Sequence, residues 1–193
     1  MDQAYSLAGY RYTGTLQWRF NAASVPAGLP VDEVLAIVQR AFDNVTDARN
    51  LCGRPDDVTA SARYLGTTNA AACPERHFRN FSVVGFGPLD DGDLAFMCPW
   101  TYRDETRLLV TDIIINSNEQ WALPLASCTG DQVMLEAVMT HEVGHAFGLD
   151  HVRQRRHPDL TMRPRIGPCD NGPSTLGLGD VLGLEELYGA ATP

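Results

Sequence analysis

The chain has 193 residues, a length that suits one domain and leaves little room for a second. Its formal net charge of −9 makes it a poor nucleic-acid binder, because phosphate binding needs clustered positive charge. Apolar residues make up 44% of the chain, enough for a buried core, yet no apolar run approaches the roughly 18 residues of a membrane span. We therefore expect neither a nucleic acid nor a membrane as partner.

The hydrophobic pattern changes between the period of strands and the period of helices. Alternating apolar residues predict a strand with one buried face at 15–20, and apolar residues at helical spacing predict a helix at 30–47. Pro99 places one later strand at an edge, because proline cannot donate to a sheet ladder. The further predicted elements are strands at 58–64, 81–86, 94–102 and 108–116, a helix at 131–147 and a short helix at 178–188.

The order of these elements predicts an α/β (α+β) fold. We expect a twisted five-stranded mixed sheet with two long helices, and the most apolar strand, 108–116, in a central position. A loop-rich stretch precedes the last helix. The prediction is a single domain over 1–193, with an N-terminal subdomain at 1–148 and a small C-terminal subdomain at 149–193.

One stretch across the end of the second long helix carries the residues of a metal site. Residues 141–151 read His-Glu-Val-Gly-His-Ala-Phe-Gly-Leu-Asp-His. Positions i and i+4 of a helix share a face, roughly 6 Å apart along the axis, so His141 and His145 can offer two imidazoles to one zinc ion. Gly148 can adopt a left-handed conformation and turn the chain back, which brings His151 in as a third ligand.

Three protein ligands leave a fourth position for water, which distinguishes a catalytic zinc from a closed structural one. Glu142 directly follows the first ligand and is placed to act without binding the metal. Its carboxylate can take a proton from a zinc-activated water and later pass it to a leaving amine. The pattern therefore predicts a zinc hydrolase with Glu142 as general base.

Other interpretations of the same residues are open. Two histidines on one helix face are often ordinary core or surface residues, although the matching Glu142 and Gly148 make coincidence a poor explanation. A zinc amidohydrolase acting on a non-protein substrate would use the same groups, and digestion of casein or gelatin would separate it from a peptidase. A non-catalytic zinc-binding module is a third possibility, but such a module has no use for the Glu142 carboxylate.

At these residues the chain resembles the metzincin zinc endopeptidases and, within them, the matrixins, the matrix-metalloproteinase-like group. Residues 160–164, Leu-Thr-Met-Arg-Pro, resemble the Met-turn of that group. Residues 178–189 resemble its closing helix, and residues 92–96 resemble the edge strand that pairs with substrate. The resemblance implies a zinc endopeptidase that cleaves internal peptide bonds of a protein or peptide substrate.

The resemblance also implies roles for individual residues. Met162 is the Met-turn residue that forms an apolar floor under the zinc, although taken alone it is any core methionine. Asp180 is the buried aspartate that ties the last helix to that turn, although taken alone it is a helix cap. Gly148 supports the turn before the third ligand. The positions that bind an extended substrate, partly by strand addition, are Leu94, Ala95, Pro164 and Ile166.

The chain departs from the matrixin pattern at several positions. Gly179 stands where many matrixins carry an aspartate that receives the ammonium of the mature N-terminus, so we expect that salt bridge to be missing. Phe96 stands where animal matrixins have a histidine for a second zinc, so we expect one catalytic zinc. Arg165 and Ile166 replace the usual pocket-wall residues, so pocket preference is not carried over. These departures indicate a bacterial secreted branch.

The five cysteines match no CxxC motif, and we expect them to form disulfides in a secreted monomer whose signal peptide is absent from this chain. The expected fold brings Cys128 and Cys169 together as one pair. Two of Cys52, Cys73 and Cys98 are expected to pair, with the choice left open. Residues 52–56 echo the inhibitory cysteine segment of matrixin propeptides, but a turn with a disulfide cysteine is the preferred interpretation.

An acidic turn adds one further candidate site. Asp90, Asp91 and Asp93 could bind calcium, because hard cations take several oxygen ligands on a flexible loop. An exposed acidic turn without an ion is the commoner arrangement.

Overall fold

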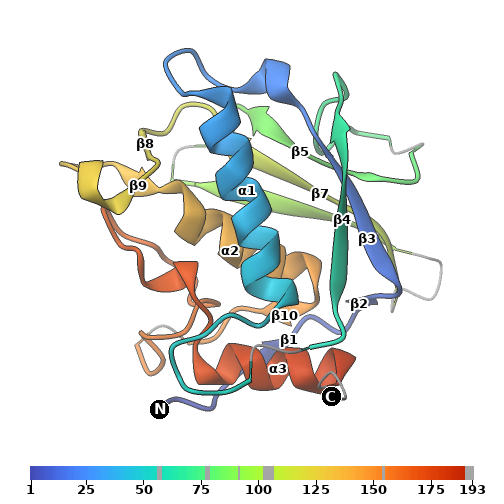
Figure 1. Cartoon of the computed structure of the whole chain (residues 1–193), viewed down its shortest axis with the longest axis vertical. Coiled ribbons are helices and arrows are strands. Elements are labelled where there is room, and N and C mark those ends of the chain that lie inside the picture. Colours follow the sequence, from blue (N-terminus) through green and yellow to red (C-terminus); the bar gives the residue numbers. More distant parts are fainter. Residues whose placement is uncertain (56–57, 77–78, 91, 102–106, 154, 190–193) are drawn as a thin grey trace.

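A twisted mixed sheet of five long strands, extended by one two-residue strand, forms the framework in the computed structural model (Figure 1). The structure describes residues 1–193 apart from 56–57, 77–78, 91, 102–106, 154 and 190–193. The sheet has the order β2-β7-β5-β3-β4, and β6 pairs antiparallel with β7 while the other pairs are parallel. Its strands are β2 (Arg11–Tyr12), β3 (Thr15–Phe20), β4 (Ser61–Thr67), β5 (Ser82–Gly87), β6 (Ala95–Thr101) and β7 (Arg107–Asn116).

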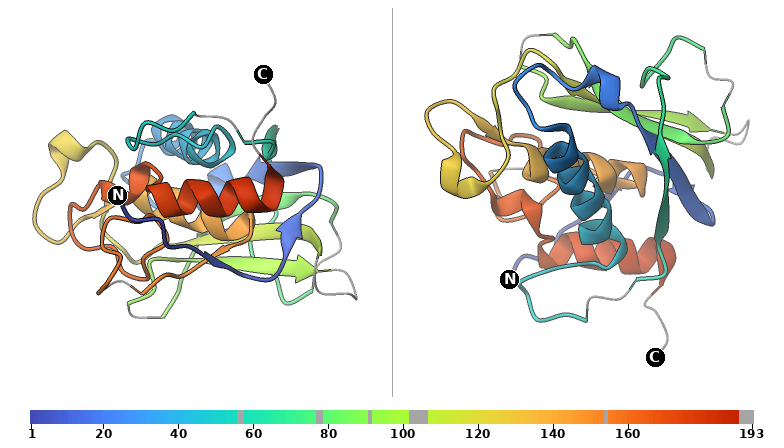
Figure 2. Two further views of the ribbon diagram at one scale, coloured as in Figure 1. Left: turned by 90° about the horizontal axis from the view of Figure 1, so that it is seen from below. Right: turned by 45° about the horizontal axis from the view of Figure 1, so that its top comes forward.

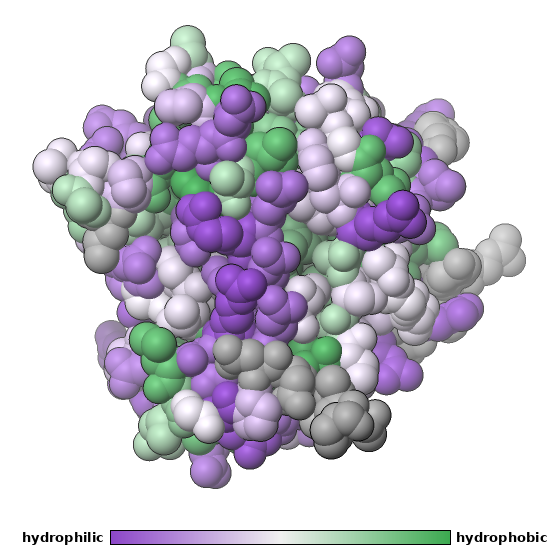
Figure 3. All heavy atoms as spheres, in the orientation of Figure 1, coloured by the Kyte–Doolittle hydropathy of each residue, from purple (hydrophilic) through white to green (hydrophobic). Residues whose placement is uncertain are grey.

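The helices α1 (Val31–Thr46) and α2 (Leu135–Ala146) share one hydrophobic core with the sheet. The alternation predicted for β3 is confirmed, because Leu16, Trp18 and Phe20 are buried. Trp18 stacks on Phe42 of α1, with ring centroids 4.5 Å apart. The outer face of α1 is polar, and hydrophilic side chains run down the middle of the surface on that side (Figure 3). The predicted α/β class is confirmed.

Two predicted elements begin later than the sequence pattern indicates. The strand predicted at 58–64 is β4 at 61–67, because the backbone N–H of Thr59 donates to Gly189 at the chain's C-terminal end and not to the sheet. The helix predicted at 131–147 begins at Leu135. Its first residues form β9 (Val133–Met134), which pairs in parallel with β8 (Trp121–Ala122). Tertiary pairing therefore overrides a continuous helical pattern there.

The N-terminal residues form a segment to which the hydrophobic pattern assigns no structure. We call residues 4–12 the N-terminal strap. Its strand β1 (Ser6–Leu7) pairs antiparallel with β10 (Leu149–Asp150), and Ala8 N donates to Gly148 O at 2.9 Å. The strap runs along α3 (Leu178–Tyr188), beneath that helix in the left view of Figure 2. It therefore contacts the stretch that links the second and third predicted zinc ligands.

Two glycines allow the strap to approach this closely. A Cβ on Gly179 would lie 1.8 Å from Ala4 O, and a Cβ on Gly148 would lie 2.4 Å from Tyr10 O. Gly148 also has φ of +94°, a conformation that other residues rarely adopt. Gly179 stands where the matrixin pattern has an aspartate. Because it lacks a side chain, the strap backbone can lie directly on the first turn of α3.

Two disulfides join segments distant in the sequence. Cys128 pairs with Cys169, as predicted, and links the stretch before α2 to the loop after it. Cys73 pairs with Cys98 of β6. Cys52 is free, so the prediction that residues 52–56 hold a disulfide cysteine is wrong. Over the described residues, none of the helices combines the length and apolar character needed to cross a membrane.

We predict that Gly179→Ala destabilises the protein even though alanine is the better helix former. The added Cβ cannot coexist with Ala4 O, so the strap or α3 must move, which lowers the free energy of unfolding by about 1–3 kcal/mol. Urea unfolding measures the change. Gly167→Ala is the control, because its Cβ would meet no atom within 4 Å. A Gly179→Ala protein as stable as the wild type would contradict the observed packing.

Candidate active site

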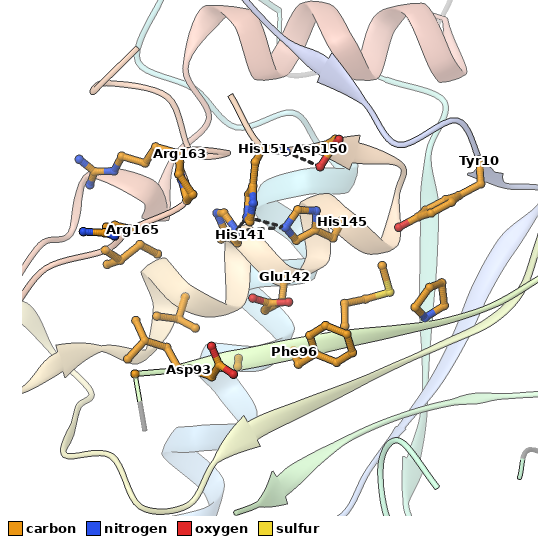
Figure 4. A pocket seen from close by; sticks show the side chains of 18 residues that line it. Tyr10, Asp93, Phe96, His141, Glu142, His145, Asp150, His151, Arg163 and Arg165 are labelled. Atoms are coloured by element: carbon orange, nitrogen blue, oxygen red, sulfur yellow. Dashed lines mark hydrogen bonds between the residues drawn. The ribbon is translucent and has the colours of Figure 1, made fainter. Parts of the chain in front are cut away.

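Three histidines converge at the C-terminal end of α2 (Figure 4). The helix presents His141 and His145 one turn apart on one face. Phe147 ends the helix, Gly148 reverses the chain, and the short strand β10 then delivers His151. The structure thus brings together the three residues that their spacing predicts as zinc ligands.

The geometry of the three imidazoles fits one zinc ion. The Nε2 atoms of His141, His145 and His151 lie 3.0 to 3.1 Å from one another. Four ligands at zinc–nitrogen distances of 2.0–2.1 Å would be separated by about 3.3 Å in a tetrahedron, close to the observed spacing. His141 Nδ1–H donates to Thr161 O at 2.8 Å, and His145 Nδ1–H donates to Leu149 O at 2.9 Å.

These hydrogen bonds decide what the Nε2 atoms can do. A carbonyl oxygen only accepts, so each Nδ1 carries the proton and each facing Nε2 presents a lone pair. Burial, reinforced by the neighbouring imidazoles, lowers the pKa of His141 to about 3. Burial also lowers the pKa of His145 and of His151. Neutral imidazoles with converging lone pairs are the form that binds a metal cation.

Glu142 lies beside the histidines and points into the same cleft (Figure 4). The residue is 7% exposed, and burial raises the pKa of its carboxyl group to about 8, against an opposing hydrogen bond from the backbone of Met97. A dication held by the histidines would lower this pKa, because an opposite charge favours the carboxylate. Burial and a bound dication thus act on this carboxyl in opposite directions, and the dication favours the carboxylate form that a general base requires.

The segment that follows the histidines packs under α2. Met162 is 1% exposed, and its Sδ atom occupies the space beside Gly144, where a Cβ would lie only 2.5 Å away. The Asp180 carboxylate accepts hydrogen bonds from Thr161 N at 2.7 Å, Gly177 N at 2.9 Å and Met162 N at 3.3 Å. Burial raises the pKa of Asp180, and these hydrogen bonds oppose the shift. Asp180 thus holds the turn whose Thr161 carbonyl orients His141.

Sequence reasoning misses the two backbone carbonyls that fix the histidine tautomers. Any residue type has a carbonyl group, so Thr161 and Leu149 carry no signal of this role in the sequence. Their function depends on where the tertiary fold places the turn after Leu160 and the strand β10. Metal-binding histidines commonly donate their second ring N–H to such an acceptor. The sequence therefore predicts that each histidine has an acceptor, but not which residue supplies it.

A cleft of about 810 Å³ runs past the histidines between β6 and the segment after Met162. Leu94 and Ala95 line one side, and Pro164 and Ile166 line another. β6 pairs with β7 on one edge, and over the described residues its other edge has no strand partner. The four residues predicted to bind substrate therefore lie along one cleft, beside an available strand edge.

Within the described residues, His141, His145 and His151 are the one group of three or more His, Cys, Asp or Glu side chains whose ligand atoms lie close enough together to hold a metal ion. Asp93 N donates to Asp90 O at 3.1 Å in the acidic turn, and Asp93 also lines the cleft. Asp91 lies outside the described residues. Calcium binding at this turn stays a prediction.

The fold and the site together define a metzincin-type metallopeptidase domain. Residues 95–189 match the family model described as Matrixin. A stretch of 78 residues, 40% of the chain, is 36% identical to matrilysin of Felis catus and covers 27% of that protein's length. The matched stretch 95–189 holds the three histidines and Glu142, so the part of the chain that carries the site is similar to the matrixin family of metalloendopeptidases. The family resemblance seen at residues 141–151 is confirmed.

We predict that Asp180→Ala strongly destabilises the protein. The substitution leaves the buried N–H groups of Thr161 and Met162 and the half-buried N–H of Gly177 without their acceptor, which lowers the free energy of unfolding by about 3 kcal/mol or more. Chemical denaturation of the metal-free protein measures the loss. The exposed Asp159 provides the control, because Asp159→Ala should change stability by less than about 0.5 kcal/mol. Similar effects of the two substitutions would show that Asp180 does not hold the turn.

Proposed function

We propose that this protein is a zinc-dependent endopeptidase. His141, His145 and His151 hold one zinc ion, and Glu142 is the general base. The observation that carries the proposal is the convergence of three imidazole Nε2 atoms beside a buried carboxylate, in a cleft with an available strand edge. A closed structural zinc site has four protein ligands and no adjacent cleft, and neither feature fits this arrangement.

Each part of the site has a chemical task in peptide hydrolysis. The zinc ion, when bound, lowers the pKa of a water molecule and polarises the carbonyl of the peptide bond. Glu142 accepts the proton of the attacking water and returns it to the nitrogen of the departing amine, so the proton count balances. The Thr161 and Leu149 carbonyls keep two imidazoles in the ligating orientation. Met162 and Asp180 hold the Thr161 carbonyl and the floor of the site in place.

The cleft suits an extended polypeptide. Leu94, just before β6, and Ala95, its first residue, offer backbone hydrogen bonds to a substrate strand, which gives affinity without selecting side chains. Pro164 and Ile166 form a facing wall that can select one side chain. The cleft has a volume of about 810 Å³, enough to hold several residues of a peptide.

We further propose that the protein is secreted and acts as a monomer of one domain, with subdomains at 1–148 and 149–193 that meet at the cleft. The two disulfides support secretion, because such bonds persist in oxidising compartments. The replacement of histidine by Phe96 supports a bacterial branch of the family. A digest of casein or gelatin with and without a zinc chelator tests the peptidase activity. Lack of chelator-sensitive cleavage would favour a zinc amidohydrolase with a non-protein substrate.

We predict that Glu142→Ala retains zinc but lowers kcat by on the order of 10²–10⁴, because no group remains to take the proton from water. Zinc content is measured by elemental analysis and activity with a quenched fluorescent peptide. Glu136→Ala is the matched control on the same helix, since Glu136 pairs with Arg40. Near-normal turnover by zinc-loaded Glu142→Ala would contradict the role of Glu142.

We predict one tightly bound zinc ion per chain. The three histidines supply one ligand set, whereas the acidic turn offers oxygen ligands, which favour calcium over zinc. Elemental analysis after dialysis against trace zinc measures the stoichiometry. His151→Ala should lower the bound zinc well below one per chain, and Asp93→Ala should leave it unchanged. A reproducible value of two zinc ions, with one lost in Asp93→Ala, would refute the prediction.

A further inference from the structure

One residue of the cleft comes from a part of the chain far from the zinc motif. Tyr10 belongs to the N-terminal strap, yet its side chain lines the same cleft as His145 and Glu142. Figure 4 shows its hydroxyl pointing towards the histidines from the side opposite Arg163 and Arg165. The matrixin match begins at residue 95, so this position lies outside the part of the chain that defines the family.

The strap holds the backbone of Tyr10 firmly. Its carbonyl packs against Gly148, in the turn between the second and third ligands, where even a Cβ would lie 2.4 Å away. On the other side, the Arg11 side chain donates to Leu187 O at 2.7 Å, and Tyr12 N donates to the hydroxyl of Tyr188 at 3.1 Å. A side chain that starts from such a fixed backbone has a defined position relative to the histidines.

The Tyr10 hydroxyl is available to a ligand. It has no hydrogen-bond partner within the described part of the chain, whereas the hydroxyl of Tyr12 donates to Leu109 O at 3.2 Å and that of Tyr188 donates to Phe147 O at 2.9 Å. Burial raises the pKa of Tyr10 to about 12, and the negative charges of Asp150 and Glu142 add to the shift. The phenol is therefore a neutral hydrogen-bond donor in the cleft at neutral pH.

The other side-chain donors of the cleft are directed elsewhere. Arg163 donates to Pro158 O at 2.9 Å and forms an ion pair with Asp170. In Figure 4 the guanidinium groups of Arg163 and Arg165 both point away from the histidines. Peptide hydrolysis builds negative charge on the carbonyl oxygen of the scissile bond, and a preorganised donor at that oxygen lowers the barrier. Tyr10 is the side chain placed to supply one.

We propose that Tyr10 is a catalytic residue of this peptidase, whose hydroxyl donates a hydrogen bond to the scissile carbonyl oxygen as that oxygen gains negative charge. The proposal rests on the peptidase function proposed above. Tyr10 transfers no proton: water adds to the carbonyl carbon, its proton passes through Glu142 to the amine nitrogen, and the C–N bond breaks. The phenol keeps its proton throughout.

The test is the kinetic comparison of Tyr10→Phe with the wild type. Tyr10→Phe keeps the ring and its packing, so zinc content and Tm should not change. Loss of one donor at a developing oxyanion should lower kcat on the order of 10²-fold with little change in KM. Tyr12→Phe is the matched control in the same strap and should retain wild-type kcat. Unchanged kcat in Tyr10→Phe, or a raised KM alone, would overturn the proposal.

A binding measurement adds a readout that does not depend on turnover. A phosphinic peptide carries a tetrahedral, negatively charged group in place of the scissile bond, and calorimetry gives its Kd. Tyr10→Phe should weaken this binding by a factor similar to the loss in kcat/KM, because both measure the transition-state contact. Equal Kd values for the two proteins would overturn the proposal.

Two further comparisons keep the outcome decisive. If Tyr10→Phe fails to fold, Tyr10→Gln and Tyr10→Leu both lack the ring but differ in the donor, and Tyr10→Gln should retain the higher kcat. Equal kcat values in this pair would also overturn the proposal. An inactive wild-type protein with a full complement of zinc would refute the peptidase function itself, whereas an active wild type with an unaffected Tyr10→Phe refutes only the role of Tyr10.

Discussion

Three imidazole Nε2 atoms facing one another at about 3 Å are the constraint on which the rest of this structure depends. Such an arrangement is unfavourable without a cation, because the lone pairs repel and burial disfavours protonation of the rings. The fold must therefore hold the three side chains against that repulsion until zinc binds. It does so through rigid backbone: a buried helix for two ligands, a glycine turn for the return, and a short strand for the third.

The support for these ligands extends through three layers of contact. Thr161 O and Leu149 O fix the two helical histidines, and Asp180 fixes the turn that carries Thr161. The Cys128–Cys169 disulfide closes the loop that contains this turn. A buried carboxylate thus acts on the metal centre through its hydrogen bonds to the turn that carries Thr161. This arrangement explains how a loop-rich segment can position a site that demands sub-ångström precision.

The N-terminal strap is attached to α3 by close backbone packing. An aspartate at position 179 would offer a charged partner to an amino terminus, whereas Gly179 allows Ala4 to lie directly on α3. The strap then continues past Gly148 as β1 and carries Tyr10 into the cleft. The close packing of the strap therefore depends on both glycines. Through this packing, the N-terminal residues reach the candidate active site.

The sequence by itself determined the features that depend on local spacing. The i, i+4 histidines, Glu142 and Gly148 define the ligand set, because helix periodicity and glycine φ freedom act over a few residues. The alternation at 15–20 and the helical pattern at 30–47 likewise fixed β3 and α1. Only the tertiary structure decided the start of α2, the partner of Cys73, the carbonyls that orient the histidines and the entry of Tyr10 into the cleft. Each of these features depends on contacts between segments that are far apart in the chain, and local spacing does not encode such contacts. Where backbone groups make the contact, as the carbonyls do, the residue type gives no signal either, because every residue has the same backbone.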